Sequence, residues 1–117
     1  MDGLNKQIIR TLNKAFEAGD HDAIVALLTD DVVWEVPPHF TARGKAEFRS
    51  FITNPTADGP PAIELRNLVS EGDDVTVEGY VENKFVGGGV FRARFHNAYR
   101  LKGGKIAKMT SYVVPTP

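Results

Sequence analysis

The sequence predicts a single α+β domain in which helices pack on one face of an antiparallel sheet. In the first half of the chain, apolar residues recur at helical spacing. In the second half, apolar and polar residues alternate in segments separated by glycine-containing turns. The length of 117 residues suits one hydrophobic core and is too short for two. The predicted order is helix, helix, strand, helix and then four strands.

Two helices are predicted at the N-terminus. Apolar residues recur every three or four positions from residue 4 to residue 16, and charged residues occupy the opposite face. Gly19 is expected to end this helix in the left-handed conformation, and Asp20 is expected to cap a second, shorter helix. The apolar side of that helix is predicted to consist of Ile24, Leu27 and Leu28.

One strand and a third helix are predicted next. Residues 32–36 are β-branched or aromatic apart from one glutamate, which is typical of a strand, and Pro37-Pro38 should end it. Gly44 precedes a third apolar pattern at helical spacing, which ends near Asn54. Residues 54–61 are rich in proline and polar residues and are expected to form a loop.

Four strands are predicted for the remainder, at residues 63–69, 75–86, 90–101 and 105–114. Alternation in the last three places one set of side chains toward the helices and another on the outer face. Gly79 lies within a long strand, where it indicates a bend. The outer face should carry the following residues: Glu78, Tyr80, Glu82, Lys84, Arg92, Arg94, His96, Arg100 and Tyr112.

Composition excludes several classes of function. A net charge of −1 gives no electrostatic case for binding nucleic acid or an anionic membrane. No apolar run is long enough to span a bilayer, and the N-terminus lacks the layout of a secretory signal, so we expect a cytoplasmic protein. The chain has no cysteine, and its three histidines are scattered, so neither a metal site nor a cofactor is predicted.

Five short motifs resemble the SnoaL-like branch of the nuclear transport factor 2-like superfamily, which also contains the ketosteroid isomerases. They are residues 16–20 (FEAGD), 27–34 (LLTDDVVW), 43–48 (RGKAEF), 71–73 (EGD), and 99–101 (YRL) followed by 104–106 (GKI). This resemblance implies one SnoaL-like domain over residues 1–117, a cone-shaped curved sheet closed by the helices around a pocket, and a homodimer through the outer sheet face. The fold hosts isomerases, dehydratases, cyclases, epoxide hydrolases and non-catalytic proteins, so it does not define the function.

The resemblance also locates the residues that a ketosteroid isomerase would use. That mechanism needs an aspartate base and an oxyanion hole made of a tyrosine and a protonated aspartate. The corresponding positions here hold Val36, Leu12 and Asn97. A valine cannot accept a proton, so we reject the steroid isomerase mechanism.

Glu35 and His39 are weak catalytic candidates. Strand alternation turns Glu35 away from the side of Trp34 and Val36, which favours a solvated or salt-bridged glutamate over a base that a bulge moves into the pocket. His39 is expected at the pocket rim, either as an exposed loop histidine or as an acid–base group near neutral pH. His21 is expected to face solvent.

Asn83 and Asn97 lie among apolar neighbours on the inner faces of adjacent predicted strands. They are either buried amides bonded to backbone or water, or a polar floor that contacts a carbonyl or hydroxyl of a ligand. Aromatic and sulfur-containing residues on the same faces either line the pocket or fill a core. The predicted ligand-contacting residues are Leu12, Phe16, Trp34, Val36, Asn83, Asn97, Tyr99, Met109 and Ser111.

The leading functional hypothesis is a protein that binds a small, mostly apolar molecule. If it is an enzyme, we expect a cofactor-independent isomerase, cyclase, lyase or hydrolase that transfers protons on an apolar carbonyl compound. The alternative is a non-catalytic dimerisation or protein-interaction module with the same fold. A cavity large enough for a ligand favours the first hypothesis, and a closed, packed cone favours the second.

Overall fold

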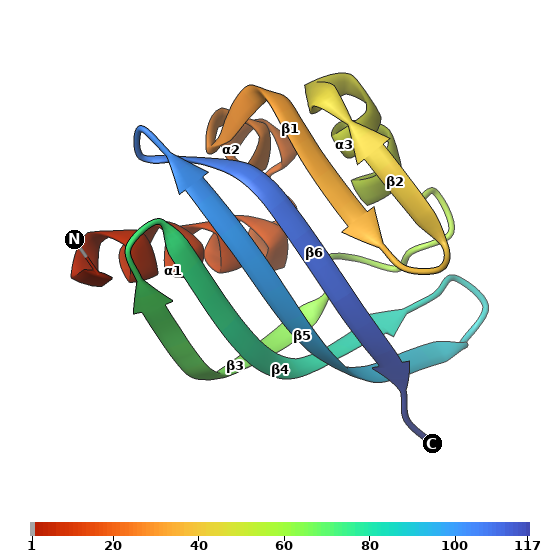
Figure 1. Ribbon diagram of the computed structural model, residues 1–117. Coiled ribbons are helices and arrows are strands. Elements are labelled where there is room, and N and C mark those ends of the chain that lie inside the picture. Colours follow the sequence, from red (N-terminus) through yellow and green to blue (C-terminus); the bar gives the residue numbers. More distant parts are fainter. Residues whose placement is uncertain (1) are drawn as a thin grey trace.

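The computed structural model describes residues 2–117 and places three helices against the concave face of a curved six-stranded sheet (Figure 1). The predicted α+β class is confirmed. The elements are α1 (Asp2–Ala18), α2 (His21–Ala26), β1 (Leu28–Val36), β2 (Phe40–Arg43), α3 (Gly44–Ile52), β3 (Ala62–Glu71), β4 (Asp74–Lys84), β5 (Val90–Lys102) and β6 (Lys105–Pro115). Among these residues, no helix combines the length and the apolar composition that crossing a bilayer requires.

The strands are ordered β2-β1-β6-β5-β4-β3 across the sheet. All neighbouring pairs are antiparallel except β1 and β6, which run parallel. The sheet is therefore mixed, whereas the sequence suggested a purely antiparallel one. Strand β2 was not expected either. The backbone N–H of His39 donates to the carbonyl of Val36 at 2.7 Å, which turns the chain back so that β2 pairs with β1.

The sequence suggested that Leu28 lies on the second helix, but it belongs to β1. Helix α2 ends at Ala26, and the N–H of Ile106 donates to the carbonyl of Leu27 at 2.8 Å. Leu28 is fully buried and lies opposite Ile106 in the sheet. Leu28 would be buried either as the last turn of α2 or as the start of β1. The hydrogen bonds with β6 make it part of the strand.

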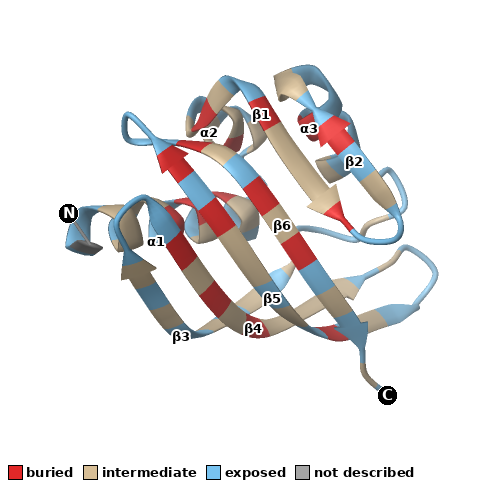
Figure 2. Cartoon of the chain, in the orientation of Figure 1, coloured by how far each residue is buried: buried red, intermediate tan, exposed pale blue. Residues whose placement is uncertain are grey.

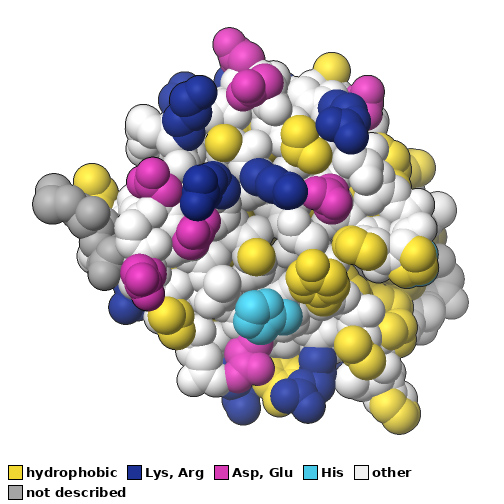
Figure 3. All heavy atoms as spheres, in the orientation of Figure 1, with side chains coloured by type: hydrophobic (Ala, Val, Ile, Leu, Met, Phe, Trp, Pro, Cys, Tyr) yellow, Lys and Arg dark blue, Asp and Glu magenta, His cyan; other side chains and the backbone are white. Residues whose placement is uncertain are grey.

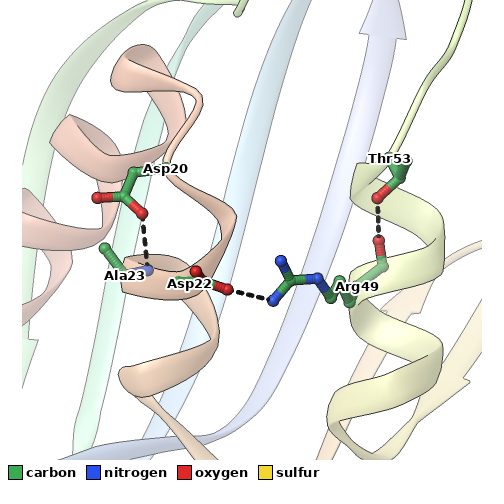
Figure 4. A network of polar contacts seen from close by, with 5 residues as sticks. All are labelled: Asp20, Asp22, Ala23, Arg49 and Thr53. Atoms are coloured by element: carbon green, nitrogen blue, oxygen red, sulfur yellow. Dashed lines mark hydrogen bonds and ion pairs between the residues drawn. The ribbon is translucent and has the colours of Figure 1, made fainter.

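The core lies between α1 and the middle of the sheet, where buried positions alternate with half-buried or exposed ones along β4, β5 and β6 (Figure 2). Exposed polar contacts position the two short helices against each other (Figure 4). Asp20 accepts from the Ala23 N–H at 3.1 Å, and Arg49 of α3 forms an ion pair with Asp22 of α2 at 2.7 Å. Such exposed pairs add little stability, but they fix the relative position of α2 and α3.

Gly79 allows the close approach of three strands. A Cβ atom at this position would lie 2.2 Å from the carbonyl oxygen of Glu64 on β3 and 2.7 Å from the ring of Phe95 on β5. No side chain fits between those groups. The glycine that the sequence marked as a bend is therefore required by contacts from both neighbouring strands.

Gly79→Ala should lower the free energy of unfolding by about 2–3 kcal/mol, because backbone and an aromatic ring must both move. Gly3→Ala is the matched control, since a methyl group there meets no atom within 4 Å. It should leave stability unchanged or raise it. Urea denaturation of both variants measures the difference, and equal stabilities would contradict the packing described here.

Candidate functional site

A cavity of about 580 Å³ lies between the concave face of the sheet and the helices. Most of its lining is aliphatic or aromatic. The cavity is lined by all nine residues predicted to contact a ligand, namely Leu12, Phe16, Trp34, Val36, Asn83, Asn97, Tyr99, Met109 and Ser111. Strand alternation indicated the inward side chains of the strands, helical spacing and the family resemblance indicated Leu12 and Phe16 on α1, and contact of all nine with a ligand stays a prediction.

One wall of the cavity is aromatic. The ring of Trp34 meets Phe40 edge-on at 5.1 Å and is supported from behind by Phe48, a core residue outside the lining, at 4.7 Å. Phe40 stacks on Phe51 at 4.0 Å with the rings almost parallel. These residues come from β1, β2 and α3. Phe40 and Phe51 were not predicted as lining residues, although the apolar alternation of Phe40 and Ala42 could have indicated the short strand β2.

Four side chains form a polar patch in this apolar lining: Trp34, Asn97, Tyr99 and Ser111. The indole N–H of Trp34 donates to Ser111 Oγ at 3.0 Å. The amide nitrogen of Asn97 donates to the hydroxyl oxygen of Tyr99, also at 3.0 Å. Asn97 lies directly opposite Ser111 in the β5–β6 pair, which brings the two hydrogen-bonded pairs together.

The polar patch offers hydroxyl groups as hydrogen-bond donors. Burial raises the pKa of Tyr99 to about 12, although the hydrogen bond from Asn97 acts in the opposite direction. Tyr99 therefore keeps its proton at neutral pH. Because its oxygen accepts from Asn97 and the oxygen of Ser111 accepts from Trp34, each hydroxyl can direct its own hydrogen elsewhere.

Asn97 lines the cavity, and both alternatives considered for it from the sequence stay predictions. Its amide nitrogen bonds a side chain and not the backbone. Its carbonyl oxygen Oδ1 is buried and has no hydrogen-bond partner among the described residues. Leaving such an acceptor unpaired costs about 1–3 kcal/mol. Asn83 also lines the cavity, on the neighbouring strand β4.

Within residues 2–117, no Asp, Glu, Lys or Arg side chain lines the cavity. Glu35 instead forms an ion pair with Lys108 at 3.0 Å. His39 is exposed, which agrees with the first of its two predicted alternatives, and it does not line the cavity. His21 does line it, contrary to the expectation that it faces solvent, because the turn at Gly19 directs the start of α2 toward the cavity.

No group of three or more His, Asp or Glu side chains in the described part of the chain could hold a metal ion. The aromatic wall and the hydroxyl donors would suit an organic molecule instead. These groups offer apolar contact and hydrogen bonding to an oxygen or nitrogen atom.

The SnoaL-like domain model matches residues 9–109 of the chain. The chain belongs to the SnoaL-like domain family. The resemblance noted in the sequence is thereby confirmed, and the folded structure agrees with it. A SnoaL-like domain accounts for the helices, the curved sheet and the enclosed cavity together. No curated protein sequence matches the chain significantly.

Several solved structures share the fold of this SnoaL-like domain. An LEH-like epoxide hydrolase from M. tuberculosis is 16% identical, with a TM-score of 0.86 over 97% of this chain and 84% of that one. TerC, co-crystallised with polyporic acid, is 22% identical, with a TM-score of 0.81 over 92% and 89%. A Catenulispora acidiphila protein with a ketosteroid isomerase-like fold, in complex with trimethylamine, is 17% identical, with a TM-score of 0.80 over 90% and 83%. At these identities the likeness establishes the fold alone.

Ionisation of Tyr99 should make stability depend on pH in alkaline solution. The unfolded tyrosine ionises near pH 10 and the folded one near pH 12. The folded state thus holds more protons between these values, and stability should fall with rising pH by about 1.4 kcal/mol per unit, about 2–3 kcal/mol in all. Tyr99→Phe should lack this component. Denaturation at pH 9–12 measures it, and identical pH profiles for the two proteins would contradict the buried, protonated hydroxyl.

Asn97→Leu should leave the free energy of unfolding unchanged or raise it by up to about 2 kcal/mol. It loses one hydrogen bond, which contributes about 1 kcal/mol, but it removes a buried acceptor that has no partner. Asn97→Asp is the matched control, since it keeps the shape and cannot donate to Tyr99, and it should be destabilised. Thermal melts distinguish these outcomes. A loss of more than about 2 kcal/mol in Asn97→Leu would mean that the amide is a structural requirement.

Proposed function

We propose that this SnoaL-like protein binds one small, mostly apolar, uncharged molecule in the cavity. The observation that carries the proposal is a cavity of about 580 Å³ with a mainly aliphatic and aromatic lining, in which residues 2–117 place no carboxylate, ammonium or guanidinium group. A ligand ion would have to leave water without a partner of opposite charge, which is costly. An uncharged molecule avoids that cost and gains from burial against the apolar lining.

The polar patch specifies one feature of the ligand. Tyr99 and Ser111 each have a hydrogen to donate, so the ligand is expected to present an oxygen acceptor, such as a carbonyl or hydroxyl, to these two residues. Asn83 adds a polar group elsewhere in the lining. A cavity of this size supports ligand binding over the alternative of a packed, non-catalytic interaction module.

Proton-transfer chemistry of the isomerase, cyclase or dehydratase type would need an acid–base group in the cavity. Glu35 and His39 lie outside it, and Val36 occupies the position of the isomerase base. Of the lining residues, His21 alone is of a type that commonly transfers protons near neutral pH. We therefore assign any such transfer in this cavity to His21.

Filling the cavity should abolish binding. Val113 lines the cavity, and its neighbour Val114 is 63% exposed on the opposite face of β6. Val113→Trp should weaken binding of the uncharged fluorescent probe N-phenyl-1-naphthylamine at least tenfold, because the indole occupies the space of the probe. Val114→Trp, the matched control, should bind as the wild type does. Fluorescence titration measures both affinities, and equal binding by the two variants would place the probe outside the cavity.

We also propose that two copies pair through the outer sheet face, as the resemblance implies. This face carries charged side chains of both signs together with apolar ones (Figure 3). Tyr112 and Val114 are 53% and 63% exposed there, and Tyr80 lies between the guanidinium groups of Arg66 and Arg94. Tyrosine and arginine are enriched in protein interfaces, and opposite charges can pair across a two-fold axis.

Tyr112→Glu should therefore shift the protein from dimer to monomer, because it buries an unpaired charge in the interface. Leu4→Glu is the matched control, since Leu4 is a similarly exposed apolar residue on α1, away from this face. It should remain dimeric. Light scattering at micromolar concentration gives both masses, and a monomeric wild type would refute the pairing.

A further inference from the structure

The exposed residues that line the cavity gather at one end of it. Deeper lining residues such as Leu12, Met109 and Ser111 are buried. The exposed ones are Gly19, Phe51, Asn54, Gly59 and Pro60. Most of them belong to the connection between α3 and β3, residues 53–61, which we call the lid loop. The lid loop therefore borders the mouth of the cavity.

One short ladder attaches the middle of the lid loop to the rest of the protein. Ala57 forms an isolated antiparallel bridge with Phe85, just beyond the end of β4. On one side of this bridge the N–H of Asp58 donates to the carbonyl of Lys84 at 2.7 Å, and on the other the N–H of Val86 donates to the carbonyl of Thr56 at 2.9 Å. Figure 1 shows the lid loop, in yellow-green, beside the hairpin that joins β4 to β5.

At the start of the loop, the backbone N–H and the hydroxyl of Thr53 donate to the carbonyl of Arg49 on α3, at 3.1 and 2.8 Å, and these bonds would anchor that end of the loop. The bonds around Asn54 are internal to the loop. Asn54 Oδ1 accepts from the backbone N–H and the hydroxyl of Thr56, at 3.0 and 2.7 Å. The carbonyl of Asn54 accepts from the N–H of Ala57 at 3.1 Å. These bonds would survive a movement of the loop as a unit, whereas the two bonds beside the Ala57–Phe85 bridge would not.

Little buried surface opposes such a movement. All residues of the lid loop are exposed or half-buried, and none belongs to the hydrophobic core. On the far side of the mouth, the Pro60 ring is close to Gly19, where a Cβ atom would lie 3.6 Å from it. Segments with few buried apolar contacts and exposed backbone hydrogen bonds open at a much lower free energy than the core does.

We propose that the lid loop opens by breaking the Ala57–Phe85 bridge and that ligands enter and leave the cavity beneath it. This proposal rests on the proposed function of the cavity. The latched loop borders the mouth in both the free and the occupied protein and narrows it, so the bridge controls the rate of exchange and has little effect on affinity. The two opposing residues thus act as a latch.

A disulfide across the latch tests this directly. The bonds on either side make Ala57 and Phe85 a non-hydrogen-bonded pair, whose Cα atoms are about 4.5 Å apart in regular antiparallel sheets. That spacing lies within the range of protein disulfides. Because the chain contains no cysteine, Ala57→Cys/Phe85→Cys can form only one intramolecular pairing.

A second disulfide supplies the matched control. The N–H of Phe85 donates to the carbonyl of Gly89, so the adjacent opposing residues Lys84 and Val90 form a non-hydrogen-bonded pair as well. Lys84→Cys/Val90→Cys joins β4 to β5 at the same hairpin and leaves the latch free. Reduction of each double variant controls for the substitutions themselves.

Stopped-flow fluorescence with N-phenyl-1-naphthylamine measures association and dissociation. In oxidised Ala57→Cys/Phe85→Cys we expect both rates to fall at least tenfold while the affinity stays within threefold of that of the reduced form. Oxidised Lys84→Cys/Val90→Cys should exchange the probe at the wild-type rate. Equal rates in oxidised and reduced Ala57→Cys/Phe85→Cys would overturn the lid and leave the proposed binding intact, whereas a wild type that binds no probe would contradict the proposed function.

Hydrogen exchange tests the opening without a ligand. The amides of Asp58 and Val86 should exchange at least a hundredfold faster than the amide of Val77, which lies in the middle of the β4–β5 ladder. Equal protection of these three amides would mean that the latch breaks only when the whole protein unfolds, and would overturn the proposal whether or not the probe binds.

Discussion

The pairing of β6 with β1 holds the two parts of the sheet together. β6 forms an antiparallel ladder with β5 on one side and a parallel ladder with β1 on the other. Within the sheet, β6 is the strand that connects the β1–β2 hairpin to the antiparallel strands β3, β4 and β5. Helix α3 follows β2 directly, so its position depends on the same pairing. Removing the β6–β1 ladder would separate the aromatic wall from the rest of the cavity.

The polar patch depends on this arrangement too. Trp34 comes from β1, Asn97 and Tyr99 from β5, and Ser111 from β6. Ser111 receives the hydrogen bond from Trp34 because β6 lies between the other two strands. Each polar group thus obtains a partner inside an apolar cavity, apart from Asn97 Oδ1. Most of the desolvation cost of placing polar groups there is therefore offset within the protein itself.

Features set by neighbours in sequence could be predicted, and features set by distant strands could not. Alternation within each strand placed Asn97 and Tyr99 of β5 and Ser111 of β6 on the inner face, because side-chain direction follows from local backbone geometry. The same alternation turned Glu35 of β1 outward. The parallel β1–β6 pair joins segments about 75 residues apart in the sequence, which no local pattern encodes. The extension of β1 back to Leu28 depends on that same distant ladder.

The limits of prediction at the cavity rim have the same physical origin. His39 follows two prolines and was expected at the rim, and the turn after β1, which leads into β2, leaves the side chain exposed. His21 was expected in solvent, since nothing in its own sequence neighbourhood shows that the lid loop and α1 enclose a mouth beside it. The rim consists of loops and helix ends, whose positions are set by tertiary contacts and not by a residue period.

The pairing within the polar patch also limits how selective the cavity can be. A site rejects an analogue strongly when a missing ligand group leaves buried protein groups unpaired. Here Trp34 is already bonded to Ser111, and Asn97 to Tyr99, without any ligand. A ligand without an oxygen atom would leave only two hydroxyl hydrogens without an acceptor, and hydroxyl groups can rotate. Shape and apolar area should therefore decide which molecules bind, and the polar patch should mainly orient them.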